Sequence, residues 1–234
     1  MPAETKTIGI LGGMGPAATV ELMSRIIRKT PAKDDDDHLR MLVDNNPKVP
    51  SRIKAILEGT GADPLPELQR MAKGLESSGA DFLVMACNTA HHYHAELAAS
   101  VAIPFLSIVD VAASRLAEDY PQARRIGFLA SPAVRQTGVY DSAFGEQGLI
   151  IVYPDEEDSA ELLGIIREVK EGLTGSVQRE RFHRVARDLA SGVDAVLVAC
   201  TELSMLPLPE TERFLVLDTL DLLADAVIAK ARGG

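Results

Sequence analysis

An internal repeat constrains the fold of this chain more than any other feature. Three segments of the first half recur, in the same order, in the second half. They are KTIGILGG and RRIGFLAS (6–13 and 124–131), SGADFLVMAC and SGVDAVLVAC (78–87 and 191–200), and FLSIVDV and FLVLDTL (105–111 and 214–220). An ordered set of repeats indicates a duplicated unit, and a unit of about 100–120 residues has the usual size of a domain.

Apolar runs rich in Val, Ile and Leu alternate with segments of helical periodicity such as 66–76 and 178–190. This alternation is typical of a parallel sheet covered by helices on both faces. The expected strands are 8–11, 41–44, 82–86, 105–109, 126–130, 149–153, 195–199 and 214–217. We therefore expect an α/β fold of two similar, doubly wound parallel-sheet (Rossmann-like) domains related by pseudo-twofold symmetry. An eightfold barrel fits less well, because it typically has about 250 residues and lacks this twofold repeat.

Composition and charge limit the function classes. The chain has 234 residues, of which 46% are hydrophobic, and can bury a substantial core. The net charge of −10 argues against a nucleic-acid surface but not against a small anionic substrate. No window approaches the roughly 20 apolar residues of a membrane span, and the N-terminus lacks a signal-peptide pattern. Two unclustered cysteines fit a reducing compartment, so we expect a cytoplasmic protein that binds neither membrane nor nucleic acid.

Both cysteines end an apolar run in equivalent halves. Cys87 and Cys200 are thus expected at the carboxyl ends of parallel strands, where open α/β sheets bind ligands. A single buried cysteine is most often a small hydrophobic residue. Two cysteines at equivalent strand ends instead favour paired catalytic thiols, whose pKa a following helix N-terminus would lower from about 8.5.

The loop GGMGPAA (12–18) follows a strand, and Pro16 marks the start of a helix, as Asp63-Pro64 does further along. Glycines before a helix let backbone N–H groups approach a small anion. The same loop also satisfies the loose G-x-G-x-x-A pattern of dinucleotide sites, or serves only as a turn. The small-anion interpretation is favoured, with the other two left open.

Two groups of residues invite a metal-site interpretation. The loop KDDDDH (33–38) combines aspartates with His38, and His91, His92 and His94 follow Cys87 closely. A solvated connection explains the first group more simply, and three histidines on one short helical stretch cannot all face one centre. We expect no metal site.

The segments GILGGMGPAAT (9–19), DNNPKVPSR (44–52), ACNTAH (86–91) and ACTEL (199–203) together resemble the aspartate/glutamate racemase family, in particular its aspartate racemase branch. The resemblance spans nearly the whole chain. It implies a cofactor-independent amino-acid racemase, usually a homodimer, with the site in the cleft between two α/β halves. It also implies that the strand at 105–109 starts the second half and the strand at 214–217 completes the first. The expected domains are residues 1–102 with 213–234, and residues 103–212.

The resemblance also assigns roles to individual residues. Cys87 and Cys200 match the catalytic cysteines, and Met14 matches a glycine-loop position that lines the site. The expected substrate-binding residues are Met14, Asn46, Arg52, Asn88, Thr89, Ser131, Lys170, Thr201 and Glu202. Among them, Asn88, Thr89 and Thr201 match groups that bind the α-carboxylate and amine, and Arg52 and Lys170 look like ligands of the side-chain carboxylate.

One position departs from the resemblance, and one residue has two alternative roles. Relatives usually read close to Ala-Thr-x-Gly-Thr where this chain has Ala130-Ser131-Pro132-Ala133-Val134, so a hydroxyl is missing at Val134. Glu202 is expected either to help deprotonate Cys200 or to raise the pKa of its thiol.

The residues themselves suit racemisation. The reaction removes the Cα proton from one face and delivers another to the opposite face, so it needs two acid/base groups around one carbon. Backbone N–H donors after each cysteine would stabilise the carbanion, in place of pyridoxal phosphate. Alternative activities are a glutamate, broad-specificity amino-acid or hydantoin racemase, or a dicarboxylate cis-trans isomerase. From other classes, a small-anion binding protein, a dinucleotide-dependent oxidoreductase and a pyridoxal-phosphate racemase stay open.

Overall fold

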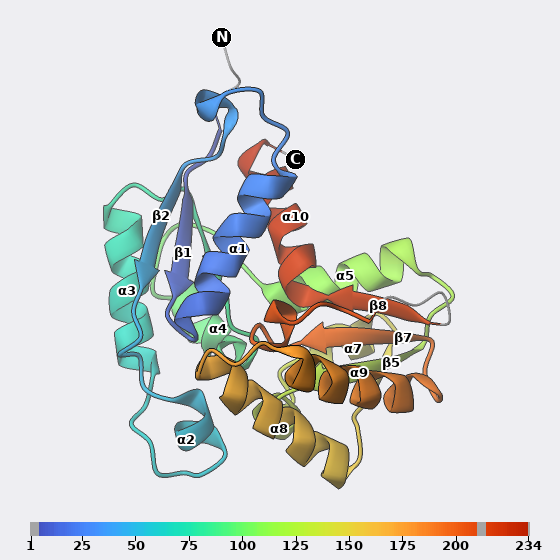
Figure 1. The fold of residues 1–234 in the computed structure, drawn as a ribbon. Helices are drawn as coiled ribbons and strands as arrows, with labels where there is room; N and C mark the ends of the chain where they lie inside the picture. The colour runs from blue at the N-terminus through green and yellow to red at the C-terminus, as the bar shows by residue number, and fades with distance from the viewer. Residues whose placement is uncertain (1–4, 210–213, 234) are drawn as a thin grey trace.

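The computed structural model describes residues 5–209 and 214–233, which form two four-stranded parallel sheets (Figure 1). The first sheet has the order β2-β1-β3-β4 and the second the order β6-β5-β7-β8. The strands are β1 (Ile8–Gly12), β2 (Met41–Asn45), β3 (Phe82–Met85), β4 (Phe105–Leu106), β5 (Arg125–Ala130), β6 (Ile150–Val152), β7 (Ala195–Ala199) and β8 (Leu215–Asp218). In both sheets the four strands, counted along the chain from the start of each half, have the order second, first, third, fourth. The predicted fold of two similar α/β halves is therefore confirmed.

Equivalent strands also occupy equivalent positions in the two sheets. In the first, Ile8 of β1 lies opposite Met41 and Phe82, so β1 is a central strand. In the second, Ile126 of β5 lies opposite Ile151 and Ala195 in the same way. All residues of β1, β3 and β7 are buried, as the unbroken apolar runs predict for strands covered on both faces.

Helices cover both faces of each sheet. The helices are α1 (Pro16–Lys29), α2 (Arg52–Ile56), α3 (Leu65–Ser77), α4 (His94–Ala98), α5 (Ile108–Asp119), α6 (Pro132–Thr137), α7 (Asp141–Glu146), α8 (Glu156–Lys170), α9 (Ser176–Ala190) and α10 (Thr219–Ala231). Three 3-10 turns, η1 (Asp35–Asp37), η2 (Thr89–Tyr93) and η3 (Leu203–Met205), lie in the connections. Helix α3 packs on the outer face of the first sheet, and α8 and α9 pack on the outer face of the second (Figure 1).

The inner faces of the two sheets share one hydrophobic core. Side chains of β1 and β5, such as Ile10 and Phe128, belong to the same cluster as Leu220 and Leu223 of α10. Helix α10 lies between α1 and α5 (Figure 1). A buried ion pair reinforces this centre, because Nη1 of Arg25 in α1 lies 2.6 Å from Oδ2 of Asp218 at the end of β8.

The predicted strand at 105–109 ends early. Ser107 accepts a hydrogen bond from the Asp110 amide at 3.1 Å and caps α5, so Ile108 and Val109 form the buried first turn of a helix. The apolar run is real, but periodicity in so short a run does not separate strand from buried helix.

The expected exchange of strands between the halves is wrong. Strand β4 pairs with β3 in the first sheet, and β8 pairs with β7 in the second. The halves are instead joined by α10, whose Asp225 binds Lys29 of α1 at 2.9 Å. The domain ranges 1–102 with 213–234, and 103–212, stay a prediction, and their second boundary falls in 210–213, outside the described residues. No helix of the described part is long and apolar enough to cross a membrane.

Candidate active site between the two halves

The two cysteines line one small cavity between the halves. Cys87 follows β3 by two residues and Cys200 directly follows β7, so each lies at the carboxyl end of its strand. Both are free thiols with 6% of their surface exposed. This inner cavity has a volume of about 30 Å³ and is lined by Met14, Ser51, Arg52, Ile53, Cys87, Thr89, Ser131, Ile166, Lys170, Cys200 and Glu202. The fold therefore brings one thiol from each half to the same place.

Polar contacts across the halves hold the residues beside the thiols. Thr89 Oγ1 lies 3.1 Å from Ser131 Oγ, and the Thr201 hydroxyl donates to the carbonyl oxygen of Ala86 at 3.3 Å. The Tyr140 hydroxyl donates to Oδ1 of Asn88. Because each contact joins the two halves, the positions of the two cysteines relative to one another are fixed by both halves together.

Cys200 is paired with a carboxylate. Its Sγ donates to Oε2 of Glu202 at 3.3 Å, and both groups are buried. Burial, and then the negative charge of Glu202, raise the pKa of the Cys200 thiol, although the amide N–H groups of Leu203 and Glu202 favour its thiolate. The expectation of a lowered thiol pKa is therefore wrong for Cys200, because burial and the charge of Glu202 outweigh these amide N–H groups. The charge of Glu202 thus favours the protonated thiol, and whether its carboxylate also takes up the Cys200 proton during a reaction stays open.

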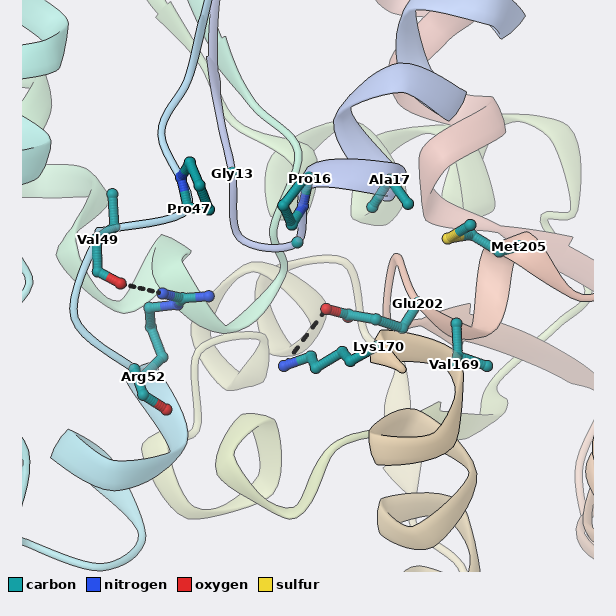
Figure 2. A pocket seen from close by; sticks show the side chains of 13 residues that line it. Gly13, Pro16, Ala17, Pro47, Val49, Arg52, Val169, Lys170, Glu202 and Met205 are labelled. Carbon is teal, nitrogen blue, oxygen red and sulfur yellow. Dashed lines mark hydrogen bonds and ion pairs between the residues drawn. The ribbon is translucent and has the colours of Figure 1, made fainter. Parts of the chain in front are cut away.

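A larger cavity opens directly outside the inner one. It has a volume of about 420 Å³ and shares Ser51, Arg52, Lys170 and Glu202 with the inner cavity. Figure 2 shows Arg52 on one side and the Lys170–Glu202 pair on the other. The Lys170 ammonium lies 3.4 Å from Oε1 of Glu202, an oxygen that accepts no hydrogen bond from the described residues. The shared residues therefore form the passage between the two cavities.

The guanidinium of Arg52 lines this passage and has N–H groups that are free to bind a substrate. It is the first residue of α2, and Ser51 caps that helix by accepting from the Lys54 amide. Its Nη1 donates to the carbonyl oxygens of Val49 and Pro50 at 3.3 and 2.8 Å, which fixes the guanidinium. Its Nε is buried without a partner among the described residues. A fixed, buried guanidinium with spare N–H groups is suited to a carboxylate.

The glycine loop borders the outer cavity on the third side. Gly13 has φ +90°, and a Cβ there would lie 2.2 Å from the backbone of Asn46, so only glycine fits. Its amide donates to Thr19 Oγ1 at 2.9 Å, which fixes the loop against α1. Pro16, Ala17 and Ala18 of the first turn of α1 line the cavity. The first turn of this helix thus adds its positive dipole end to the two cations.

The histidines after Cys87 have structural contacts. The amide of Ile108 donates to Nε2 of His91 at 3.1 Å, so Nδ1 carries the proton and donates to the carbonyl oxygen of Cys87 at 2.8 Å. Burial lowers the pKa of His91 to about 3, which keeps the ring neutral. His94 stacks on His91 with a centroid distance of 5.6 Å. Both ring nitrogens of His91 are therefore engaged, and no group of three or more His, Cys, Asp or Glu side chains within the described residues is arranged to hold a metal ion.

Most of the predicted site residues lie around the inner cavity. Those that line it are Met14, Cys87, Thr89, Arg52, Ser131, Lys170, Cys200 and Glu202. Asn88 and Thr201 are buried next to the cysteines, in the contacts between the halves. Asn46 lines neither cavity, because its Nδ2 donates to Glu67 at 2.5 Å and its Oδ1 accepts from the Lys48 amide.

The second-half loop places Val134 away from the cavities. It is fully buried in the shared core, in the first turn of α6. The residue that departs from the resemblance therefore packs against apolar neighbours. Four residues were missed by sequence reasoning: Ser51, Ile53 and Ile166, which line the inner cavity, and Tyr140, which contacts Asn88. Their types carry no signal of a site, because only the tertiary fold brings them there.

Comparisons with known proteins agree with this geometry. The sequence matches the family described as Asp/Glu/Hydantoin racemase over residues 11–227. The structure of Picrophilus torridus aspartate racemase is 33% identical, with a TM-score of 0.86 over 97% of this chain and 94% of that one. The broad-specificity amino-acid racemase RacX of Bacillus subtilis (strain 168) is 24% identical over 210 residues, which are 84% of this chain and 86% of that protein.

A more distant structure shares the fold alone. Glutamate racemase isoform RacE1 of Bacillus anthracis is 18% identical, with a TM-score of 0.68 over 98% of this chain and 84% of that one. The family match covers nearly the whole chain, including both cysteine segments and the glycine loop. With two α/β halves and one thiol from each half in a shared cavity, this chain belongs to the Asp/Glu/Hydantoin racemase family.

Proposed function

We propose that the protein interconverts L- and D-aspartate without a cofactor, using Cys87 and Cys200 as the two acid/base groups. The observation that carries the proposal is that the two thiols, from equivalent strands of the two halves, line the same cavity. A carbon held between them is reached from opposite sides by groups that exchange protons. Inversion at Cα by two opposed bases needs this arrangement.

Each cysteine acts as the base for one enantiomer and as the acid for the other. In one direction the Cys87 thiolate takes the Cα proton, and the electron pair of the broken C–H bond moves into the α-carboxylate. The Cys200 thiol then donates its proton to the opposite face of Cα and is left as the thiolate. In the other direction the roles are exchanged. The raised pKa of Cys200 suits the direction in which this residue begins as the proton donor.

Charged groups at the passage support an acidic substrate. The Arg52 guanidinium has spare N–H groups, and Lys170 faces the same space from the other half (Figure 2). A substrate whose Cα lies between the thiols would extend its side chain toward these two cations. Its carboxylate would then compete with Glu202 for Lys170, which lies at 3.4 Å in the structure.

The outer cavity favours glutamate as a second candidate substrate. Its volume of about 420 Å³, open to the same cations, offers room for one further methylene. A single methylene is worth only about 1–3 kcal/mol of discrimination. We therefore expect turnover of aspartate to exceed that of glutamate by about 10-fold to 200-fold rather than to exclude it.

Isotope exchange tests the proposed reaction. The purified protein is incubated with L-aspartate in D₂O without added cofactor, and both enantiomers are separated at early times. Two opposed bases predict deuterium in the D-aspartate formed and almost none in the remaining L-aspartate, because the incoming proton comes from a solvent-exchanged thiol. Equal labelling of both enantiomers would indicate a single base. No labelling and no inversion would contradict the proposal and favour a binding protein.

The two cysteines are then tested separately. Cys87→Ala and Cys200→Ala should each abolish inversion while thermal unfolding shows that the fold is kept. Near-normal inversion by either variant would remove that cysteine from the mechanism. Inversion that appears only after addition of pyridoxal phosphate or a nicotinamide would instead support one of the cofactor-dependent alternatives.

A homodimer belongs to the same proposal and rests on the family resemblance. One surface feature supports self-association: Val20 and Ile27, two turns apart on α1, expose 57% and 45% of their surfaces. Analytical ultracentrifugation of the wild type and of Val20→Lys measures it. A wild type that sediments as a monomer at micromolar concentration would refute the dimer.

A further inference from the structure

Within the described residues, the side-chain amide of Asn88 has a hydrogen-bonded oxygen and an unpaired nitrogen. The residue is 98% buried, and its Oδ1 accepts a hydrogen bond from the Tyr140 hydroxyl. Its Nδ2 is buried without a hydrogen-bond partner among the described residues. A buried donor left unpaired destabilises the folded state, so each such donor in a native protein calls for an explanation.

The location of Asn88 supplies that explanation. It lies between Cys87 and Thr89, both of which line the inner cavity. An amide whose oxygen is already occupied offers two N–H donors and no acceptor at its other end. Such a group is suited to a carboxylate oxygen beside Cα, where negative charge accumulates when the proton leaves.

We propose that Tyr140 is a positioning residue, whose hydroxyl holds the Asn88 amide with its nitrogen available to the substrate α-carboxylate. The part of this proposal that concerns the substrate rests on the racemase function proposed above. Without the hydroxyl, the amide is free to rotate about its last torsion and to present oxygen in place of nitrogen. A carboxylate would then meet an acceptor and be repelled.

The surroundings of Tyr140 suit a fixed donor. The side chain is fully buried, and its ring packs edge-on against Phe128 and Phe144 at centroid distances of 5.0 and 5.4 Å. Burial raises the pKa of the tyrosine well above its usual value, so the hydroxyl keeps its proton and donates. Tyr140 belongs to the second half and Asn88 to the first. The orientation of the amide therefore depends on the relative position of the two halves.

A second, half-buried tyrosine of the same aromatic cluster provides a matched control. Tyr153 packs on the same Phe128 ring at 5.7 Å, and its hydroxyl has no hydrogen-bond partner among the described residues. Tyr140→Phe and Tyr153→Phe each remove one hydroxyl from the same aromatic cluster. Only the first removes a contact to Asn88, so differences between the two variants report on that contact.

The amide orientation is measured first, without any turnover. Side-chain ¹⁵N–¹H spectra show the Asn88 amide as the signal that is lost in Asn88→Ala. We expect this signal to shift in Tyr140→Phe and to stay in place in Tyr153→Phe. An unchanged signal in Tyr140→Phe would overturn the positioning role, and this outcome does not depend on whether the protein is a racemase.

A double-mutant cycle on kcat/KM for aspartate then tests the link to the substrate. Tyr140→Phe should lower kcat/KM about tenfold in the wild-type background, the effect of losing one hydrogen bond, and by less than about twofold in Asn88→Ala. Tyr153→Phe should leave kcat/KM unchanged. A tenfold loss that persists in Asn88→Ala would show a general structural role and overturn the proposal. Absence of turnover in the wild type, with the amide shift present, would refute the racemase function and the substrate contact but retain the positioning role.

Discussion

The neutral state of His91 predicts a specific loss of stability at mildly acid pH. The ring is fully buried, accepts from the Ile108 amide and donates to the carbonyl oxygen of Cys87, so the folded protein has no place for a second ring proton. Burial lowers its pKa from 6.5 to about 3. The unfolded chain takes up this proton below pH 6.5, whereas the folded chain does so only near pH 3. Stability from His91 is therefore complete above pH 6.5 and is lost as the pH falls toward 3.

The size of the effect follows from these two pKa values. Linkage gives a loss of about 2 kcal/mol between pH 8 and pH 5, and about 4 kcal/mol if the pH reaches the folded pKa. Urea unfolding at pH 8 and pH 5 measures the difference. His91→Gln should be less stable than the wild type at pH 8 but should lose about 2 kcal/mol less on going to pH 5.

The neighbouring His92 offers a matched control, because its side chain is exposed. His92→Gln should retain the wild-type difference between pH 8 and pH 5. The reasoning fails if His91→Gln keeps the full wild-type difference, since the buried ring would then not be its source. The pH dependence of His91→Gln measures the contribution of all other titrating groups. The reasoning also fails if neither the wild type nor His91→Gln changes in stability between pH 8 and pH 5.

Three further predictions concern the charged groups. Asp218→Asn should lower the free energy of unfolding by about 3–5 kcal/mol in urea titrations, because it removes the buried carboxylate that pairs with Arg25 and leaves this guanidinium only the partly exposed Glu21 and Asp221; a loss under about 1 kcal/mol would contradict this. Glu202→Gln removes the charge that helps raise the thiol pKa, so iodoacetamide should alkylate Cys200 faster at pH 8, as followed by mass spectrometry; slower alkylation would show that the carboxylate assists deprotonation. Arg52→Gln should raise KM for aspartate about 30-fold, whereas Arg70→Gln, a change at an exposed arginine, should leave KM unchanged.

The repeated phrases were sufficient to predict the two sheets and one cysteine at the carboxyl end of an equivalent strand in each half. Apolar runs that end at Cys87 and Cys200 specify buried strands, and parallel strands of one topology place their carboxyl ends at one edge. Pro16 likewise predicted the start of α1, because proline is tolerated in the first turn of a helix. These features depend on local sequence alone.

Other features depend on individual side-chain contacts or on the packing of distant segments, which brings Cys87 and Cys200 to one cavity. The cap by Ser107 turned part of an apparent strand into α5, and the pairing of β8 with β7 overrode the exchange implied by the resemblance. Asn46 follows a strand at the expected edge, yet Glu67 binds its side chain from α3. Tyr140 and Asn88 are 52 residues apart, and no pattern in either segment predicts their hydrogen bond.

The repeat also makes visible where the two halves of the site differ. Thr89 stands two residues after Cys87. Glu202 stands two residues after Cys200, and its carboxylate accepts a hydrogen bond from the Cys200 thiol. Free enantiomers have equal energies, so the equilibrium constant of a racemase is unity, and kcat/KM must be the same in both directions. The difference between Thr89 and Glu202 can therefore make one enantiomer bind more tightly only if that enantiomer also turns over more slowly, by the same factor.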